Sequence, residues 1–164
     1  MLRDKSLIPL SHQHQHALAL CVRIERASPI PQNDLGAWQA EVAQLVQTEI
    51  AVHFAAEEEI VFPAAGKFED LRALVKQLIS EHANLRTMFA NAREDSLSSN
   101  EILVLARSLS AHIRTEERQL FERMQQLLSN EELGVLGMKL ESALKDSEEG
   151  CRVPSATTRL RPQK

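Results

Sequence analysis

Apolar residues recur every three or four positions along most of this chain, and short clusters rich in proline, serine and asparagine separate the periodic stretches. This spacing is typical of amphipathic helices. It predicts four long helices followed by a shorter one. We expect them at about 11–27, 35–62, 69–93, 100–128 and 131–145.

Local signals predict several of the helix ends. Pro63 is expected to end the second helix, because proline cannot donate a helical hydrogen bond and disfavours α geometry in the residue before it. Ser98 with Glu101, and Ser129 with Glu132, have the spacing of capping boxes and predict the starts of the fourth and fifth helices. Long helices joined by short connections favour an all-α fold, an antiparallel up-down four-helix bundle with a short additional C-terminal helix.

The length and charge of the chain narrow the class of protein. Its 164 residues suit one domain, expected over residues 1–146, and the aperiodic residues 147–164 are expected to form a flexible tail. A formal net charge of −4 provides no broad attraction to nucleic acid or to an anionic membrane. No stretch approaches the ~20 apolar residues needed to cross a bilayer, and the two cysteines match no zinc or disulfide framework, so we expect a cytoplasmic protein. The chain has no tyrosine, which excludes a mechanism based on a tyrosyl radical.

One short sequence occurs twice and suggests a site. HFAAEEEIVF begins at His53 and HIRTEERQLF begins at His112, and both follow the pattern His, three residues, Glu-Glu, three residues, Phe. A histidine and a carboxylate four residues apart lie on one face of a helix, about 5–6 Å apart at Cβ, which suits two ligands that converge on a pair of metal ions. The first glutamate of each copy, Glu57 or Glu116, continues the apolar face of its helix, and the glutamates that follow are expected to point outward.

The other two long helices each place one histidine on their apolar face, His14 on the first and His82 on the third. At ~100° per residue, His12 and His16 lie toward the outer surface, with His16 the second candidate on that helix. Glu49 is an additional candidate for an inward-facing carboxylate. The sequence leaves open whether five further residues contribute to a site: His12, His16, Glu49, Glu58 and Glu117.

Two interpretations of this residue set compete. A single histidine on an apolar face is more often a core residue than a ligand, and histidines and glutamates can form a buried hydrogen-bond network without metal. Buried, ionised Glu57 and Glu116 would however be costly without positive charge, and no lysine or arginine shares their apolar faces. We therefore predict a di-metal site. Its expected ligands are His14, His53, Glu57, His82, His112 and Glu116. Nitrogen and carboxylate donors without thiolate suit iron or manganese, and also zinc.

With these motifs the chain resembles the hemerythrin-like, HHE cation-binding domain family. The resemblance covers roughly residues 7–145 and rests on HQHAL, HFAAEEEIVFP, EHANLR and HIRTEERQLF. It implies a four-helix bundle around a non-haem di-iron centre, with histidines as terminal ligands and Glu57 and Glu116 bridging the irons. The ligand set is closer to members with four histidines and two glutamates than to oxygen carriers. Oxygen carriers have two histidines four residues apart on the third helix, whereas Leu78 and Arg86 stand four residues from His82.

From this resemblance we expect a non-haem di-iron protein, with an oxo or hydroxo bridge, that binds O₂, nitric oxide or peroxide for sensing, buffering or iron handling. One alternative is a di-iron redox enzyme, such as a peroxidase, a nitric oxide reductase or a protein that repairs iron centres. Such an enzyme would need a protein redox partner, which the sequence does not identify. A third alternative, a metal-free helical interaction module, also stays open.

Overall fold

The computed structural model describes residues 2–145, 147 and 154–160. The fold is all-α, as the hydrophobic pattern predicts, and no strand occurs in this described part of the chain. The first helix, α1, spans Ile8–Ala27. The second helical rod is longer and changes its hydrogen-bond pattern along its length. It consists of α2 (Gln32–Leu45), the π-helix η1 (Val46–Ile50), α3 (Ala51–Ala56), the π-helix η2 (Glu57–Val61) and α4 (Phe62–Ala65).

The second half of the bundle repeats this organisation. A short 3-10 turn, η3 (Glu69–Leu71), leads into α5 (Arg72–Arg93). The fourth rod consists of α6 (Ser99–Thr115), the π-helix η4 (Glu116–Phe121) and α7 (Glu122–Leu127). The last helix, α8, spans Asn130–Leu144.

The predicted ends agree with the structure at both capping boxes but not everywhere, since α1 begins three residues before the expected 11 and α2 three residues before the expected 35. Both capping boxes are present, with Ser98 and Glu101 at the start of α6 and Ser129 and Glu132 at the start of α8. The prediction that Pro63 ends the second helix is wrong, because the rod continues to Ala65. Pro63 falls in the first turn of α4, directly after the π-helix, where an α-helical segment does not require the missing backbone N–H.

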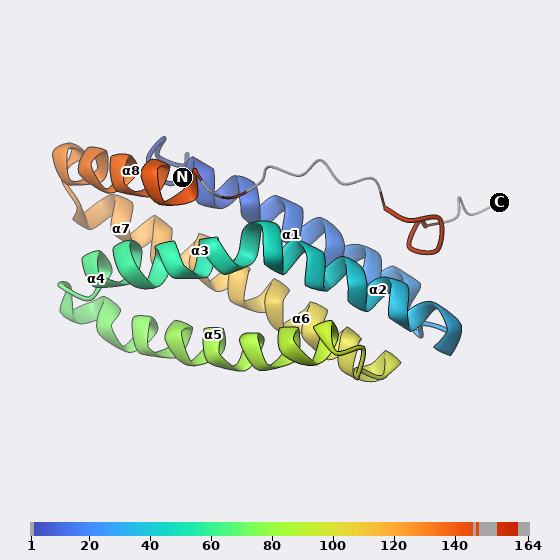
Figure 1. Cartoon of the computed structure of the whole chain (residues 1–164). Helices are drawn as coiled ribbons and strands as arrows, with labels where there is room; N and C mark the ends of the chain where they lie inside the picture. Colours follow the sequence, from blue (N-terminus) through green and yellow to red (C-terminus); the bar gives the residue numbers. More distant parts are fainter. Residues whose placement is uncertain (1, 146, 148–153, 161–164) are drawn as a thin grey trace.

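Four rods lie side by side, and α8 covers one end of the bundle beside α3 and η2 (Figure 1). Helix α1 packs on α6, and α2 packs on α5. The buried apolar side chains form two clusters along the bundle. One is built largely from α1, α2, α5 and α6, and the other from the ends of the rods next to α8. The buried histidines and glutamates belong to neither cluster, so the polar residues of the site interrupt the apolar core.

The predicted division between the bundle and a flexible C-terminal tail stays a prediction. Within residues 154–160, Thr158 is buried and its carbonyl oxygen accepts a hydrogen bond from Arg23 at 3.4 Å. The rest of the predicted tail, residues 148–153 and 161–164, lies outside the described residues, as does Cys151. Across the part of the chain that the structure describes, no helix is both long and apolar enough to span a membrane.

Candidate metal centre

The structure brings together the six residues that the sequence predicts as ligands. Each has an exposed fraction of at most 2%. They form two groups of four, and within each group one potential ligand atom of every residue lies within 4.8 Å of the others. His14 and His53 belong to one group, called position 1 below, and His82 and His112 belong to the other, called position 2. The carboxylates Glu57 and Glu116 are common to both groups: His14, His53, Glu57, Glu116 and Glu57, His82, His112, Glu116.

The Nε2 atoms of the histidines all point into the space between the glutamates. At position 1, the Nε2 atoms of His14 and His53 are 2.9 Å apart, and at position 2 those of His82 and His112 are 3.0 Å apart. Glu57 spans both positions, with Oε1 at 3.2 Å from His53 Nε2 and Oε2 at 3.4 Å from His82 Nε2. Glu116 does the same, with Oε1 at 3.2 Å from His112 Nε2 and Oε2 at 3.3 Å from His14 Nε2.

The other ring nitrogen of every histidine faces a hydrogen-bond acceptor. The Nδ1 atom of His14 lies 2.7 Å from Glu117, and that of His82 lies 2.8 Å from Glu58. For His53 the partner is the amide oxygen of Gln13 at 2.8 Å, and for His112 it is Glu81 at 2.7 Å. Because an ionised carboxylate or an amide oxygen only accepts, each Nδ1 carries the proton as the donor. A neutral ring then has its lone pair on Nε2, the tautomer needed to bind a metal ion there.

The duplicated sequence gives the site an approximate two-fold symmetry. In each copy, the histidine and the first glutamate line the centre. The second glutamate accepts a hydrogen bond from a histidine on another helix: Glu58 from His82, and Glu117 from His14. An arginine completes each arrangement, with Arg86 paired to Glu58 and Arg3 paired to Glu117.

The phenylalanine that ends each copy contacts the same histidine as the second glutamate. Phe62 lies 5.3 Å from His82, and Phe121 stacks on His14 at 5.8 Å between ring centroids. Each copy therefore supplies its own histidine and carboxylate to the centre and also positions the histidine of a neighbouring helix.

Two of the π-helices, η2 and η4, coincide with the site. η2 begins at Glu57 and η4 begins at Glu116, the two carboxylates shared by both positions. A π-helical turn closes its hydrogen bond over one residue more than an α-helical turn, and such turns occur often at functional sites. In each copy two consecutive glutamates serve the site, the first at its centre and the second at a histidine.

The chemistry of the centre favours a bound cation. All four carboxylate oxygens of Glu57 and Glu116 are buried without a hydrogen-bond partner. Within the described residues, histidines are the only basic side chains within 4.0 Å of them. Burial raises the pKa of Glu57, but the nearby histidines, His53 above all, together outweigh this and hold that pKa well below the usual range. Burial likewise lowers the pKa of His14, but its nearby carboxylates, Glu116 above all, raise it to about 10. A buried pair of carboxylates that stays ionised in this way fits metal ions as counter-charge.

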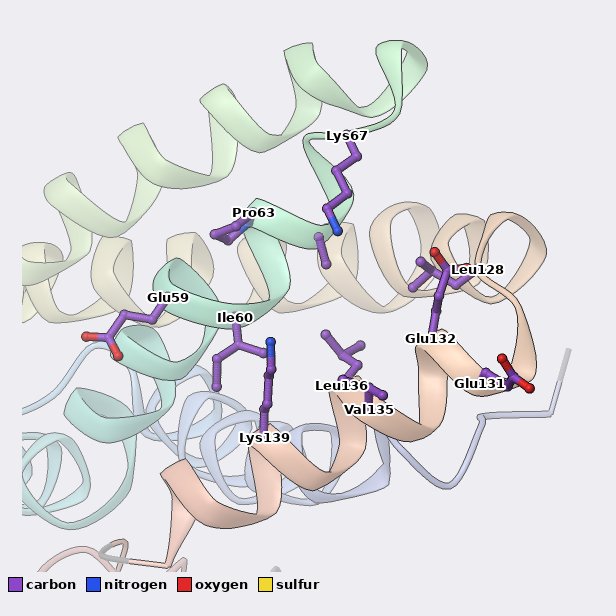
Figure 2. A pocket seen from close by; sticks show the side chains of 11 residues that line it. Glu59, Ile60, Pro63, Lys67, Leu128, Glu131, Glu132, Val135, Leu136 and Lys139 are labelled. Carbon is purple, nitrogen blue, oxygen red and sulfur yellow. The ribbon is translucent and has the colours of Figure 1, made fainter.

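The structure also places the residues whose roles the sequence left open. His12 is exposed, and His16 is partly buried with its Nδ1 2.9 Å from the buried carboxylate of Glu49, outside both groups. The prediction that the later glutamates point outward is confirmed for the exposed Glu59 but not for Glu58 and Glu117, which are partly buried against His82 and His14. Glu59 lines a groove of about 400 Å³ beside α8, on the outside of the rod (Figure 2).

Sequence reasoning missed two residues of the site, Gln13 and Glu81. Each directly precedes a predicted ligand, His14 or His82, so its side chain points along a different direction of the helix. Their contacts reach a histidine of another helix, which no periodicity within one helix reveals. The sequence contained one signal for them: on both helices a side chain that can accept a hydrogen bond, Gln13 or Glu81, directly precedes the histidine.

A cavity of about 630 Å³ opens between α5 and α6 and reaches the edge of the site. Glu81 and His112 line it, together with apolar and small polar side chains such as Leu85 and Ser108. His112 itself is only 2% exposed. The wall of position 2 therefore lies directly beneath a space large enough for a small molecule.

Comparison with known proteins agrees with this geometry. The model of the hemerythrin HHE cation binding domain matches residues 9–124, which include all six predicted ligands. Neither the curated proteins nor the solved structures contain a significant match to the chain. The match spans most of the chain and the structure supplies a helical bundle with two histidine and glutamate clusters, so this chain belongs to the hemerythrin HHE cation-binding domain family.

Proposed function

We propose that this protein holds a di-iron centre that binds a small ligand, O₂, nitric oxide or peroxide, for sensing, buffering or iron handling. The observation that carries the proposal is the pair of four-residue groups that share Glu57 and Glu116. Two carboxylates common to two pairs of histidines are the arrangement expected for two ions held close together. Imidazole and carboxylate donors without thiolate suit iron, and manganese or zinc would be accepted by the same donors.

A bound di-iron pair would supply redox chemistry and open coordination sites for a small ligand. Three features of the chain favour this chemistry. Glu58, Glu81, Glu117 and Gln13 hold the four rings with Nε2 directed at the centre. The two apolar clusters exclude bulk water from either side. The cavity between α5 and α6 brings a small molecule to the outer side of His112, at the edge of position 2.

The test is to load the metal-free protein with ferrous iron without oxygen and to measure the iron bound per chain. We expect two ions per chain, and a charge-transfer absorption band after rapid mixing with O₂. Glu116→Ala should lose iron, whereas Glu59→Ala should keep it, because Glu59 lines the outer groove. A protein that stays free of iron under these conditions refutes the proposal.

The cavity beside His112 also favours a second candidate, a di-iron enzyme that reduces peroxide or nitric oxide. The two functions differ in turnover. An enzyme would consume many equivalents of substrate when supplied with a chemical reductant. A sensor or buffer would react once per centre.

A further inference from the structure

The acceptors of the Nδ1 hydrogen bonds in the two halves of the site differ in charge at one matched pair of residues. Gln13 directly precedes His14, and Glu81 directly precedes His82. Gln13 accepts the Nδ1 hydrogen bond of His53 at position 1, and Glu81 accepts that of His112 at position 2. The remaining charged partners correspond in kind, since the Glu58 and Arg86 pair at one histidine matches the Glu117 and Arg3 pair at the other. The neighbours Phe54 and Ile113 also differ, but both are uncharged. The buried Glu49, which Ser108 matches in the other half, is paired with His16 and not with a histidine of the site.

The neutral acceptor at position 1 is fixed in its orientation by a chain of hydrogen bonds. Ser147 Oγ donates to the carbonyl oxygen of Leu144 at 2.6 Å, so it accepts from Gln13 Nε2 at 2.9 Å. The amide oxygen of Gln13 must then face His53 Nδ1. An amide in this orientation accepts the proton of the ring but brings no charge.

The acceptor at position 2 carries a full negative charge. Glu81 Oε2 lies 2.7 Å from His112 Nδ1, and its other oxygen accepts a hydrogen bond from Gln77 at 2.8 Å. Among the described residues no lysine or arginine lies within 4.0 Å of this carboxylate. A carboxylate bonded to Nδ1 makes the ring a stronger base at Nε2 than an amide does, and its charge also attracts a cation held there.

We propose that the two metal positions are inequivalent, and that position 2, with His82 and His112, binds its ion more tightly than position 1. Gln13 marks the weaker position, which fills second and empties first. This inference rests on the proposed metal centre and adds a state in which one ion is bound. In that state Glu57 and Glu116 would both bind the single ion at position 2, and position 1 would be empty.

The experiment compares variants in which only one position keeps both histidines. Two ions that share carboxylates repel each other, so even equal positions would fill in two steps in the unaltered protein. His53→Ala leaves position 2 complete, and His112→Ala leaves position 1 complete. Each metal-free, full-length variant is titrated with Co²⁺ against a competing chelator. We expect His53→Ala to bind its ion roughly 10–100-fold more tightly than His112→Ala.

Exchanging the acceptors should exchange the affinities. Adding Glu81→Gln to His53→Ala should lower its affinity to that of His112→Ala, and adding Gln13→Glu to His112→Ala should raise the affinity of position 1. Glu59→Gln in the His53→Ala background is the matched control. It removes the same charge from a side chain that contacts none of the histidines.

Two results would overturn the inference. One is equal affinity for Co²⁺ in His53→Ala and His112→Ala. The other is a loss of affinity on adding Glu59→Gln that is as large as the loss on adding Glu81→Gln. An unaltered protein that binds no Co²⁺ at all would instead refute the metal centre itself. Because the Gln13→Glu arm predicts a gain of affinity, general disruption of the fold by a substitution cannot produce the expected pattern.

Discussion

Removing bound metal should destabilise the bundle by an amount that follows from the number of positions. The ligands come from four different rods, so the folded chain can assemble both positions and the unfolded chain cannot. An ion at a concentration 100 times its dissociation constant stabilises the folded state by about 2.7 kcal/mol, so two positions contribute roughly 5 kcal/mol. For a domain of this size that corresponds to a rise in Tm of roughly 10–20 °C.

Scanning calorimetry of the full chain, with metal and then with excess chelator, measures this shift. The Tm should also rise steadily with free metal concentration, as linkage requires. A variant with Glu57→Ala and Glu116→Ala should lose the dependence on metal, because both shared carboxylates are gone. The reasoning is refuted if the chelator strips the ions and the Tm stays the same, or if the double variant keeps the full shift.

Three further predictions concern the bundle around the site. Phe54→Ala should lower the free energy of unfolding by about 3–5 kcal/mol in denaturant titrations, because this ring is only 3% exposed and stacks on a histidine of the site; Phe54→Leu should cost less. Hydrogen bonds from Ser98 lower the pKa of Glu101, so its stabilising effect is complete above the ordinary carboxyl pKa of 4.5 and is lost as the pH falls below it. Glu101→Gln should flatten the dependence of stability on pH in that range, and an unchanged slope would contradict this. Burial raises the pKa of the Cys21 thiol to about 11, so in a Cys151→Ser background the native protein should react with a thiol reagent only as fast as it unfolds.

Much of the fold follows from periodicity and end signals. The predicted starts of the fourth and fifth helices differ from the observed ones by one residue, since those ends depend on the local side-chain hydrogen bonds of the capping boxes. The third helix is expected from 69, where the structure has the 3-10 turn η3 before α5 begins at Arg72. Pro63 misled the prediction because its effect depends on the hydrogen-bond pattern before it, and the π-helix η2 has no signature in a pattern of apolar residues.

The placement of the six predicted ligands follows from the apolar faces of single helices, because each ligand lies on the face of its helix that is buried in the core of the bundle. The residues that support the ligands do not follow in this way. The second glutamates, Glu58 and Glu117, are only partly buried and therefore match an ordinary solvated position. Their contacts with His82 and His14 depend on how the rods pack, so they become visible only in three dimensions.

The contact between His14 and Glu117 joins residues 103 positions apart in the chain. With Arg3 on the far side of Glu117, the N-terminal segment is tied to the fourth rod through the wall of the site. An ion bound by His14 and Glu116 would close the chain between these two residues into one loop, much as a long-range cross-link does, and the entropy of closing such a loop grows only slowly with its length. The first helix could then not leave the bundle without releasing an ion, and loss of metal would expose the start of the chain to proteases before the rest of the bundle opens.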